Sequence, residues 1–207
     1  MTGAHDPVLH VLAGPNGSGK TTLVERVLQP ATGLPFVNAD VIAKQRWPRA
    51  AAEHSYEAAQ LAAAERAALI GQGRSFLAET VFSHPSKVEL LEVARAADYC
   101  ITLHVLLIPV ELAVARVRDR VAKHGHEVPE DKVRGRYERL WALVAAAIRI
   151  ADDAIVYDNS AAATPFRPVC SFNHGHPVRP AVWPSWTPED LRAATGDLLR
   201  ARRRPSS

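Results

Sequence analysis

The feature that most constrains this chain is a glycine-rich segment near its start, Gly14-Pro-Asn-Gly-Ser-Gly-Lys20-Thr21. The segment matches the pattern GxxxxGK[ST] at every position. It follows an apolar run, Val8–Ala13, and precedes a helical pattern, Thr21–Leu28. In this context the glycines let successive backbone N–H groups point into one concavity, and the helix N-terminus adds partial positive charge. The segment therefore predicts a strand–loop–helix unit that binds the phosphates of a nucleoside triphosphate.

Each part of this loop has an expected role. Lys20 should reach the β- and γ-phosphates, and the Thr21 hydroxyl should ligate Mg²⁺. The nucleotide-binding residues predicted by the motif are Gly14, Asn16, Gly17, Ser18, Gly19, Lys20, Thr21 and Thr22.

Downstream of the loop, short apolar runs alternate with longer helical stretches, which is typical of a parallel sheet covered by helices. We expect strands at 8–13, 36–38, 75–80, 101–108 and 154–157, and helices at 21–28, 50–70, 87–97, 111–123 and 130–150. Six prolines from Pro165 to Pro188 interrupt the later sequence, although Thr187-Pro-Glu-Asp predicts the start of a final helix to about Arg200. We therefore expect a core over residues 1–160 and a proline-rich appendage over 161–207.

Composition excludes several classes of protein. Hydrophobic residues make up 47% and charged residues 23% of the 207, which is ordinary for one globular domain. No apolar run is long enough for a membrane span. Two cysteines are too few for a disulfide framework, and the start lacks the pattern of a secretory signal, so we expect a cytoplasmic protein. The basic tail, Arg200 to Arg204, is either solvated or contacts an acidic surface; with only 6% aromatic residues, nucleic acid is not the expected partner.

Polar residues follow three of the expected strands. The chain lacks the Asn-Lys-x-Asp motif of a GTPase and the Leu-Ser-Gly-Gly-Gln signature of an ABC-type ATPase, and its size suits a small kinase. Because ligands meet an open α/β sheet at the carboxyl ends of its strands, Asp40 can accept the proton of an acceptor hydroxyl. Asp40 can also cap the next helix. Glu79 and Thr80 either face the same cleft or form a polar strand end. Asp158 and Asn159 contact the adenine, approach Mg²⁺ or cap a strand.

The segment 111–139 is rich in arginine. Arg116, Arg120 and Lys123 share one face of the expected helix, and a second group follows at Arg134, Arg136 and Arg139. These side chains form either a solvated basic face or an arginine-bearing lid that closes over the phosphates. The pairs His124/His126 and His174/His176 have a spacing that can hold a metal, but no further ligands complete a site.

Five blocks of the sequence resemble, in the same order, the zeta toxin family of P-loop kinases. The blocks are GPNGSGKTT, VNAD, FLAETVFS, ELAVARVRDRVAKHGHEVPEDKVRGRY and AIVYDNS, and they span about residues 8–160. The short bacterial members are the most similar in style. The resemblance implies a three-layer α/β P-loop fold, with helices on both faces of a five-stranded parallel sheet in the order 2-3-1-4-5. It also implies ATP and Mg²⁺ as cofactors.

The same resemblance implies an activity. Zeta toxins phosphorylate the 3′-hydroxyl of the sugar in UDP-N-acetylglucosamine, and an epsilon antitoxin protein blocks their ATP site. Carried over by motif, Asp40 is the catalytic base, Lys20 and Thr21 serve phosphate and Mg²⁺, and Glu79 and Thr80 bind the sugar nucleotide. By the same correspondence, Arg120 and Arg136 stabilise the transferring phosphoryl group.

The chain departs from the family at two places in the arginine-rich segment. It has His124-Gly125-His126 where Gly-Gly-His is usual, and Leu140 where the family has serine. These departures leave the acceptor open. Alternatives are another small-molecule hydroxyl, as in chloramphenicol phosphotransferase, and an ATP-binding regulatory protein with slow ATPase activity. A nucleic-acid kinase that uses the basic tail is a third alternative.

Overall fold

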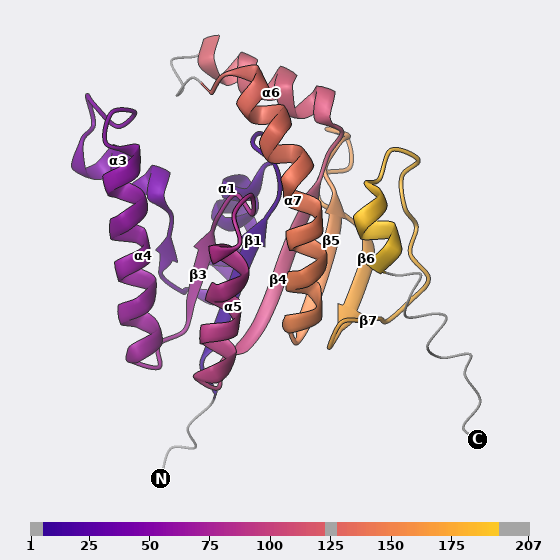
Figure 1. Ribbon diagram of the computed structural model, residues 1–207, viewed down its shortest axis with the longest axis horizontal. Helices are drawn as coiled ribbons and strands as arrows, with labels where there is room; N and C mark the ends of the chain where they lie inside the picture. The colour runs from indigo at the N-terminus through magenta and orange to yellow at the C-terminus, as the bar shows by residue number, and fades with distance from the viewer. Residues whose placement is uncertain (1–5, 123–127, 195–207) are drawn as a thin grey trace.

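The protein is built around a seven-stranded sheet with helices on both faces, as seen in a computed structural model that describes residues 6–122 and 128–194 (Figure 1). The strand order is β2-β3-β1-β4-β5-β6-β7. Their bounds are β1 (Val8–Ala13), β2 (Phe36–Val37), β3 (Phe76–Glu79), β4 (Cys100–Leu107), β5 (Asp153–Asp158), β6 (Arg167–Asn173) and β7 (His176–Pro177). The first five strands pair in parallel, so the predicted α/β class and the order 2-3-1-4-5 are confirmed.

The predicted number of strands, five, is wrong because the proline-rich segment adds two. β6 pairs antiparallel with β5, and β7 pairs antiparallel with β6. Pro168 lies opposite Tyr157, beside a register shift in the ladder, where the missing N–H of proline costs little. The division into a core at 1–160 and an appendage at 161–207 stays a prediction, although the sheet runs on across residue 160.

One face of the sheet is covered by a helical rod that follows the glycine-rich loop. The rod consists of α1 (Lys20–Leu23), the π-helical η1 (Val24–Leu28) and α2 (Gln29–Thr32). We expected this helix to end before Pro30, but it continues to Thr32. In the π turn Gln29 N–H bonds to the Val24 carbonyl, five residues back. This wider turn makes room for the Pro30 ring, which in a regular α-helix clashes with the carbonyl four residues earlier.

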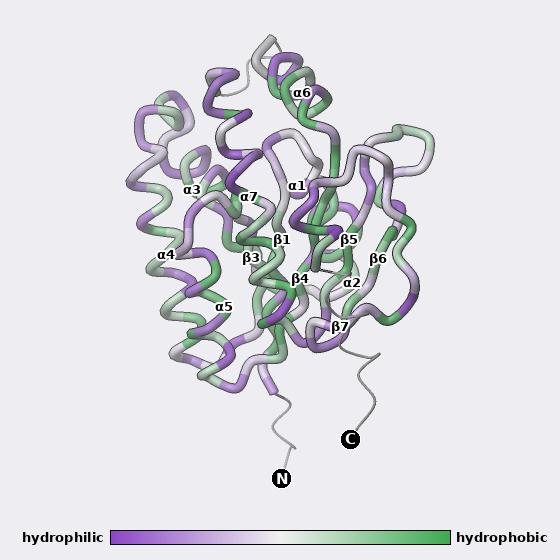
Figure 2. Tube along the Cα trace, turned by 45° about the vertical axis from the view of Figure 1, so that its right-hand side comes forward, coloured by the Kyte–Doolittle hydropathy of each residue, from purple (hydrophilic) through white to green (hydrophobic). Residues whose placement is uncertain are grey.

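The opposite face is covered by α4 (Ser55–Gly71), α5 (Ser86–Ala96) and α7 (Glu130–Ile150). Alternate strand residues point to the two faces, so Leu9 and Val11 of β1 pack with α4, α5 and α7, whereas Leu12 packs with α1 and η1. Figure 2 shows the hydrophobic strands between helices that are partly hydrophilic. This arrangement leaves the carboxyl ends of the parallel strands uncovered by either layer.

Two helices lie near these carboxyl ends, α3 (Ala39–Arg46) and α6 (Val110–Ala122) (Figure 1). The expected final helix begins at residue 189 and is helical to 194; its expected end at about Arg200 lies outside the described residues. Within the ranges 6–122 and 128–194, no helix has the length and apolar character needed to cross a membrane.

Candidate active site

The glycine-rich loop joins β1 to α1 in a conformation that needs glycine. Gly14 and Gly19 have φ angles of +149° and +93°, which side chains rarely allow. A Cβ on Gly14 would lie 2.6 Å from the Leu106 carbonyl oxygen, and one on Gly19 would lie 2.6 Å from Asn159 Nδ2. The loop backbone therefore packs directly against β4 and the end of β5.

Two polar side chains of the loop, Ser18 and Lys20, are buried. Lys20 Nζ donates to the carbonyl oxygens of Gly14, at 3.0 Å, and Pro15, at 3.1 Å. Burial lowers the pKa of Lys20, and the nearby Glu79 carboxylate offsets part of that effect. Ser18 Oγ is buried and has no hydrogen-bond partner among the described residues, a deficiency that a phosphate oxygen would correct. The loop is thus suited to an anion and has an unfilled hydrogen-bonding group for it.

Glu79, the last residue of β3, connects this loop to the residue that caps α3 after the end of β2. Its Oε2 accepts hydrogen bonds from Thr21 Oγ1 at 2.8 Å and from Asn38 Nδ2 at 2.6 Å. Its Oε1 lies 3.8 Å from Lys20 Nζ. The sequence predicted that Glu79 would line a substrate cleft; the structure also brings it into contact with both predicted phosphate residues.

The adjoining Thr21 hydroxyl and Glu79 carboxylate fit a magnesium ion. Mg²⁺ prefers oxygen ligands, and in phosphate loops of this type it uses a Ser or Thr hydroxyl together with phosphate oxygens. In the described part of the chain, no group of three or more His, Cys, Asp or Glu side chains is arranged to hold a metal. An ion at Thr21 would therefore depend on oxygens that a bound nucleotide supplies.

Asp40 lies in the first turn of α3 and is exposed. Its alternative role as a helix cap is wrong, because β2 ends at Val37 and leaves Asn38 to cap α3. Asn38 Oδ1 accepts from Asp40 N at 2.7 Å and from Val41 N at 3.2 Å. The Asp40 carboxylate is left without a capping bond, and its charge acts to raise the pKa of Lys20.

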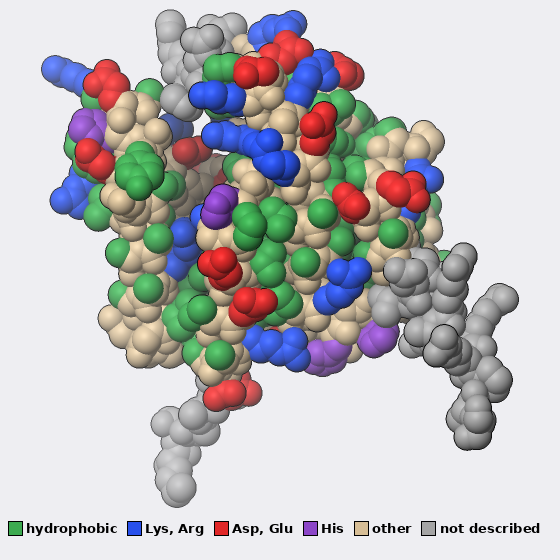
Figure 3. Space-filling view, in the orientation of Figure 1, with side chains coloured by type: hydrophobic (Ala, Val, Ile, Leu, Met, Phe, Trp, Pro, Cys, Tyr) green, Lys and Arg blue, Asp and Glu red, His purple; other side chains and the backbone are tan. Residues whose placement is uncertain are grey.

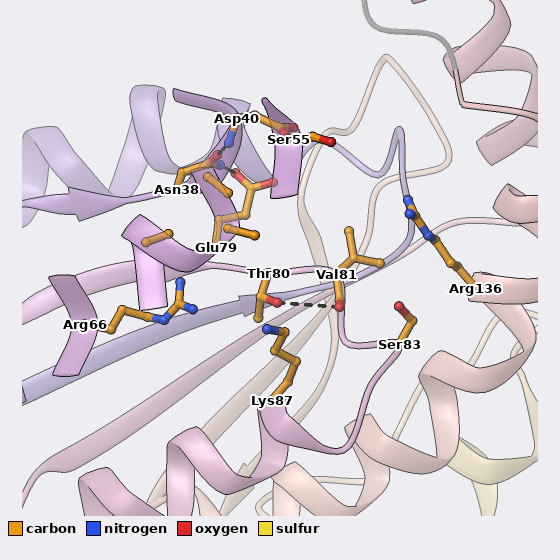
Figure 4. Close-up of a pocket in the computed structure, with 13 residues that line it drawn as sticks. Asn38, Asp40, Ser55, Arg66, Glu79, Thr80, Val81, Ser83, Lys87 and Arg136 are labelled. Carbon is orange, nitrogen blue, oxygen red and sulfur yellow. Dashed lines mark hydrogen bonds between the residues drawn. The ribbon is translucent and has the colours of Figure 1, made fainter. Parts of the chain in front are cut away.

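A cavity of about 320 Å³ lies beside the loop, with walls from α3, α4, β3, α5 and α7 (Figure 4). Asp40, Glu79, Thr80 and Arg136 line it, so four of the predicted site residues share one space. Two further lining residues, Arg66 and Lys87, were not identified from the sequence. The spacing of the residues in α4 could have identified Arg66. Ala58, Ala62 and Arg66 occur every fourth residue on the buried face of this helix, so one charged side chain lies on a face of small apolar residues.

The arginines of α6 and α7 divide into two groups. Arg116 Nη1 donates to the Gly17 carbonyl at 3.4 Å, and the charge of Arg120 contributes to the lowered pKa of Lys20, after the larger effect of burial. Arg134 instead bonds Glu111, at 2.7 and 2.8 Å, and Glu130, so it holds the two helices together. Figure 3 shows basic side chains over α6 and α7 beside a hollow next to α3 and α4.

Three other residues that the sequence singled out make contacts within the fold. Asn159 Nδ2 donates to the Ser18 carbonyl at 2.8 Å, and its Oδ1 accepts from Phe166 N at 3.2 Å, so Asn159 supports the loop. Asp158 is paired with Arg167 at 2.8 Å. His174 Nδ1 lies 3.5 Å from Asp152 Oδ1. Lys123, His124 and His126 lie outside the described residues, so the predicted lid is described only in part.

Comparison with known proteins identifies the family of the chain. A family model described as an AAA domain matches residues 9–156. The chain belongs to this AAA domain family. No curated protein matches the sequence of this AAA domain.

Several solved structures are similar to this AAA domain. A chain of the AvrRxo1-ORF1:AvrRxo1-ORF2 complex with ATP has a TM-score of 0.66 and 16% identity, over 99% of this chain and 67% of that one. The PezAT toxin–antitoxin system of Streptococcus pneumoniae has a TM-score of 0.54 and 15% identity, over 75% and 68%. Shikimate kinase from Acinetobacter baumannii has a TM-score of 0.51 and 20% identity, over 76% and 86%. At these identities the likeness shows a P-loop kinase-like fold.

Proposed function

We propose that this protein is an ATP-dependent kinase that transfers a γ-phosphoryl group to a hydroxyl of a small molecule. The observation that carries the proposal is the position of Glu79. This side chain contacts Lys20 and Thr21 in the phosphate loop, and it also lines the cavity that contains Asp40. An acceptor in that cavity would therefore lie next to the end of a triphosphate in the loop.

The proposed reaction uses the chain's own residues at defined points. Asp40 accepts the proton of the acceptor hydroxyl while the oxygen of that hydroxyl bonds to the γ-phosphorus. The bond between the γ-phosphorus and the bridging oxygen of the β-phosphate breaks, and ADP leaves. Lys20 leaves its backbone acceptors and binds the phosphates. Arg120 and Arg136 neutralise charge on the transferring group. Thr21, oriented by Glu79, would hold Mg²⁺, which supplies charge neutralisation at the phosphate oxygens.

We propose a nucleotide sugar as the acceptor, specifically the 3′-hydroxyl of UDP-N-acetylglucosamine, with Glu79 and Thr80 contacting the sugar. Support comes from the five sequence blocks shared with zeta toxins and from the fold likeness to the PezAT system. An antitoxin-like protein is the proposed macromolecular partner, because two similar structures come from systems that are named with a second component. The proposed setting is the cytoplasm.

Phosphorus NMR tests both the reaction and the base. Wild-type protein with ATP, Mg²⁺ and UDP-N-acetylglucosamine should give a new phosphomonoester resonance. Asp40→Ala should lose that resonance while it still binds ATP, because its carboxylate acts on the acceptor. Asp131→Ala, which changes an exposed aspartate at the start of α7, is the matched control. Turnover by Asp40→Ala at the wild-type rate would remove Asp40 from the mechanism.

A second function, an ATP-binding regulatory protein with slow ATPase activity, is favoured by one observation. Lys20 is held by two backbone carbonyls and lies 3.8 Å from Glu79 Oε1, so it has to leave these partners before it binds a phosphate. In that case ATP would be hydrolysed equally with and without any acceptor. The same NMR experiment with chloramphenicol in place of the nucleotide sugar tests the other small-molecule alternative.

A further inference from the structure

Two cationic side chains meet in the part of the cavity away from Asp40. Arg66 comes from α4 and Lys87 from α5, and Figure 4 shows both beside Thr80, whereas Asp40 and Ser55 lie at the opposite side. Arg66 is only 7% exposed, and Lys87 is partly buried. A buried arginine and a partly buried lysine thus face the same small space.

Neither cation is fully neutralised by the described residues around it. Among the residues that the structure describes, neither Arg66 nor Lys87 forms an ion pair or a side-chain hydrogen bond. Burial lowers the pKa of Arg66, and the charge of the adjacent Glu65 only partly offsets this. Burial also lowers the pKa of Lys87, and the charge of Arg66 lowers it further. Two like charges without a counter-ion are costly to bury, and a bound anion removes that cost.

The surrounding residues leave room for such an anion. Ala59 and Ala62 form the α4 wall beside Arg66, and their small side chains do not fill the cavity. Among the described residues, the Thr80 hydroxyl makes only a long bond, at 3.5 Å, to the Val81 carbonyl, so it remains available as a donor. A guanidinium fork, an ammonium and a hydroxyl together offer the donors that phosphate and carboxylate groups accept.

We infer that Arg66 and Lys87 form a subsite for an oxyanion of the acceptor, either a phosphate or a carboxylate. The inference rests on the proposed kinase function, because it places the anionic group at one side of the cavity and the reacting hydroxyl at Asp40 on the other. The acceptor would then be an anionic molecule, oriented by the group that does not react. A neutral molecule with the same hydroxyl would bind weakly.

Calorimetric titration with simple anions tests the subsite directly. The phosphate loop is first filled with a non-hydrolysable ATP analogue and Mg²⁺, and pyrophosphate or malonate is then titrated. Arg66→Gln and Lys87→Gln should each weaken binding by about tenfold or more, which is the usual contribution of a charged hydrogen bond. Arg179→Gln and Lys132→Gln change exposed residues outside the cavity and should bind as wild type. Tighter binding of pyrophosphate than of malonate assigns phosphate, and the reverse assigns carboxylate.

Thermal unfolding provides a second readout that separates binding from damage to the fold. Without anion, Arg66→Gln should unfold at the same temperature as wild type or higher, because it removes an uncompensated buried charge. Added pyrophosphate should raise the unfolding temperature of wild type more than that of Arg66→Gln or Lys87→Gln. An equal rise in all proteins, or no saturable titration of wild type, would overturn the inference.

Kinetics with paired acceptors distinguishes failure of the subsite from failure of the kinase proposal. Wild type should prefer N-acetylglucosamine 1-phosphate to N-acetylglucosamine, and Lys87→Gln should raise KM for the phosphorylated sugar far more than for the neutral one. Equal turnover of both sugars, unaffected by either substitution, would reject the subsite and leave the kinase standing. Saturable anion binding that depends on Arg66, with no turnover that depends on an acceptor, would reject the kinase and keep the subsite.

Discussion

At the scale of single residues, Glu79 has more contacts in the site than its sequence position indicated. It accepts hydrogen bonds from Thr21 and Asn38 and is close to Lys20. A strand-end carboxylate was predictable from the pattern, but its partners were not, because they come from the residue that follows β2 and from the first turn of α1. Only the order of strands 2-3-1 in the sheet brings those three segments together.

Replacing Glu79 tests its proposed role in orienting Thr21 for magnesium. Glu79→Gln keeps the size of the side chain but loses its charge and one acceptor oxygen. We expect the Mg²⁺ concentration for half-maximal phosphotransfer to rise about tenfold, as is typical when a residue that orients a metal ligand is changed. Rates measured across a Mg²⁺ titration provide the check, with the exposed Glu89→Gln as control. An unchanged Mg²⁺ dependence would restrict Glu79 to contact with the acceptor.

The close packing of Gly19 leads to a second prediction, with an internal control. Gly19→Ala places a Cβ 2.6 Å from Asn159 Nδ2 at a φ of +93°, whereas Gly33→Ala at +66° meets nothing within 4 Å. Both substitutions place a side chain at a left-handed backbone position, which costs about 1 kcal/mol of stability. Only Gly19→Ala must also displace Asn159. We expect Gly19→Ala to weaken ATP binding at least tenfold and Gly33→Ala to leave it unchanged. Fluorescent-nucleotide titration and urea unfolding would measure the two effects, and equal ATP affinity in both variants would contradict this account.

At the scale of elements, a polar chain centred on the buried His104 crosses three strands. His10 Nδ1 lies 3.1 Å from His104 Nε2, and His104 Nδ1 lies 3.3 Å from the Tyr157 hydroxyl, which links β1, β4 and β5. Burial is the main cause that lowers the pKa of His104 to about 3, and the neighbouring His10 adds to it. His104 therefore stays neutral in the folded protein at pH values where the unfolded chain takes up a proton.

The sign of the resulting pH dependence follows from this difference. Because the folded pKa of about 3 is below the ordinary value of 6.5, the unfolded state binds more protons in that interval. The free energy of unfolding should therefore fall as the pH falls below about 6.5, by up to about 1.4 kcal/mol per pH unit for this one group. His104→Gln should flatten that slope in urea unfolding at several pH values. A slope that the substitution leaves intact would assign the acid sensitivity to other groups.

The sequence predicted most elements because their local signals agreed with the final packing. α7 has the expected bounds, and β1, β3, β4 and β5 differ from expectation by at most two residues at either end. β6 was missed because Pro168 and its neighbouring prolines normally exclude a strand, and only the register shift in β5 tolerates one. The subsite cations Arg66 and Lys87 were missed because their convergence depends on how α4 and α5 pack on the sheet.

At the scale of the whole molecule, the added strands close one side of the sheet. Val169, Cys170 and Phe172 of β6 are buried with the same apolar cluster that contains Val156 of β5 and Ile148 of α7. The segment after residue 160 therefore contributes to the main core, and its loss would leave β5 as an open edge.

Truncation tests whether residues 1–160 are a core that folds alone. A chain that ends at residue 160 loses five buried hydrophobic side chains of the described residues and exposes their partners: Val169, Cys170, Phe172, Leu191 and Ala194. Burial of a Val, Leu or Phe side chain alone is worth about 1.5–3 kcal/mol. We expect it to unfold at much lower urea concentration than the full chain, or to aggregate, as followed by circular dichroism and light scattering. Equal stability of the shorter chain would confirm the division at residue 160.

The bond from Asn159 to Ser18 has a consequence for the order in which the protein matures during synthesis. The phosphate loop leaves the ribosome before its support, which comes from a residue 141 positions later that is itself fixed by the Phe166 backbone. A nascent chain that carries the complete GxxxxGK[ST] motif would thus lack a finished nucleotide pocket until residues 159–166 have been made. ATP would help to stabilise the nascent protein only after that segment has emerged.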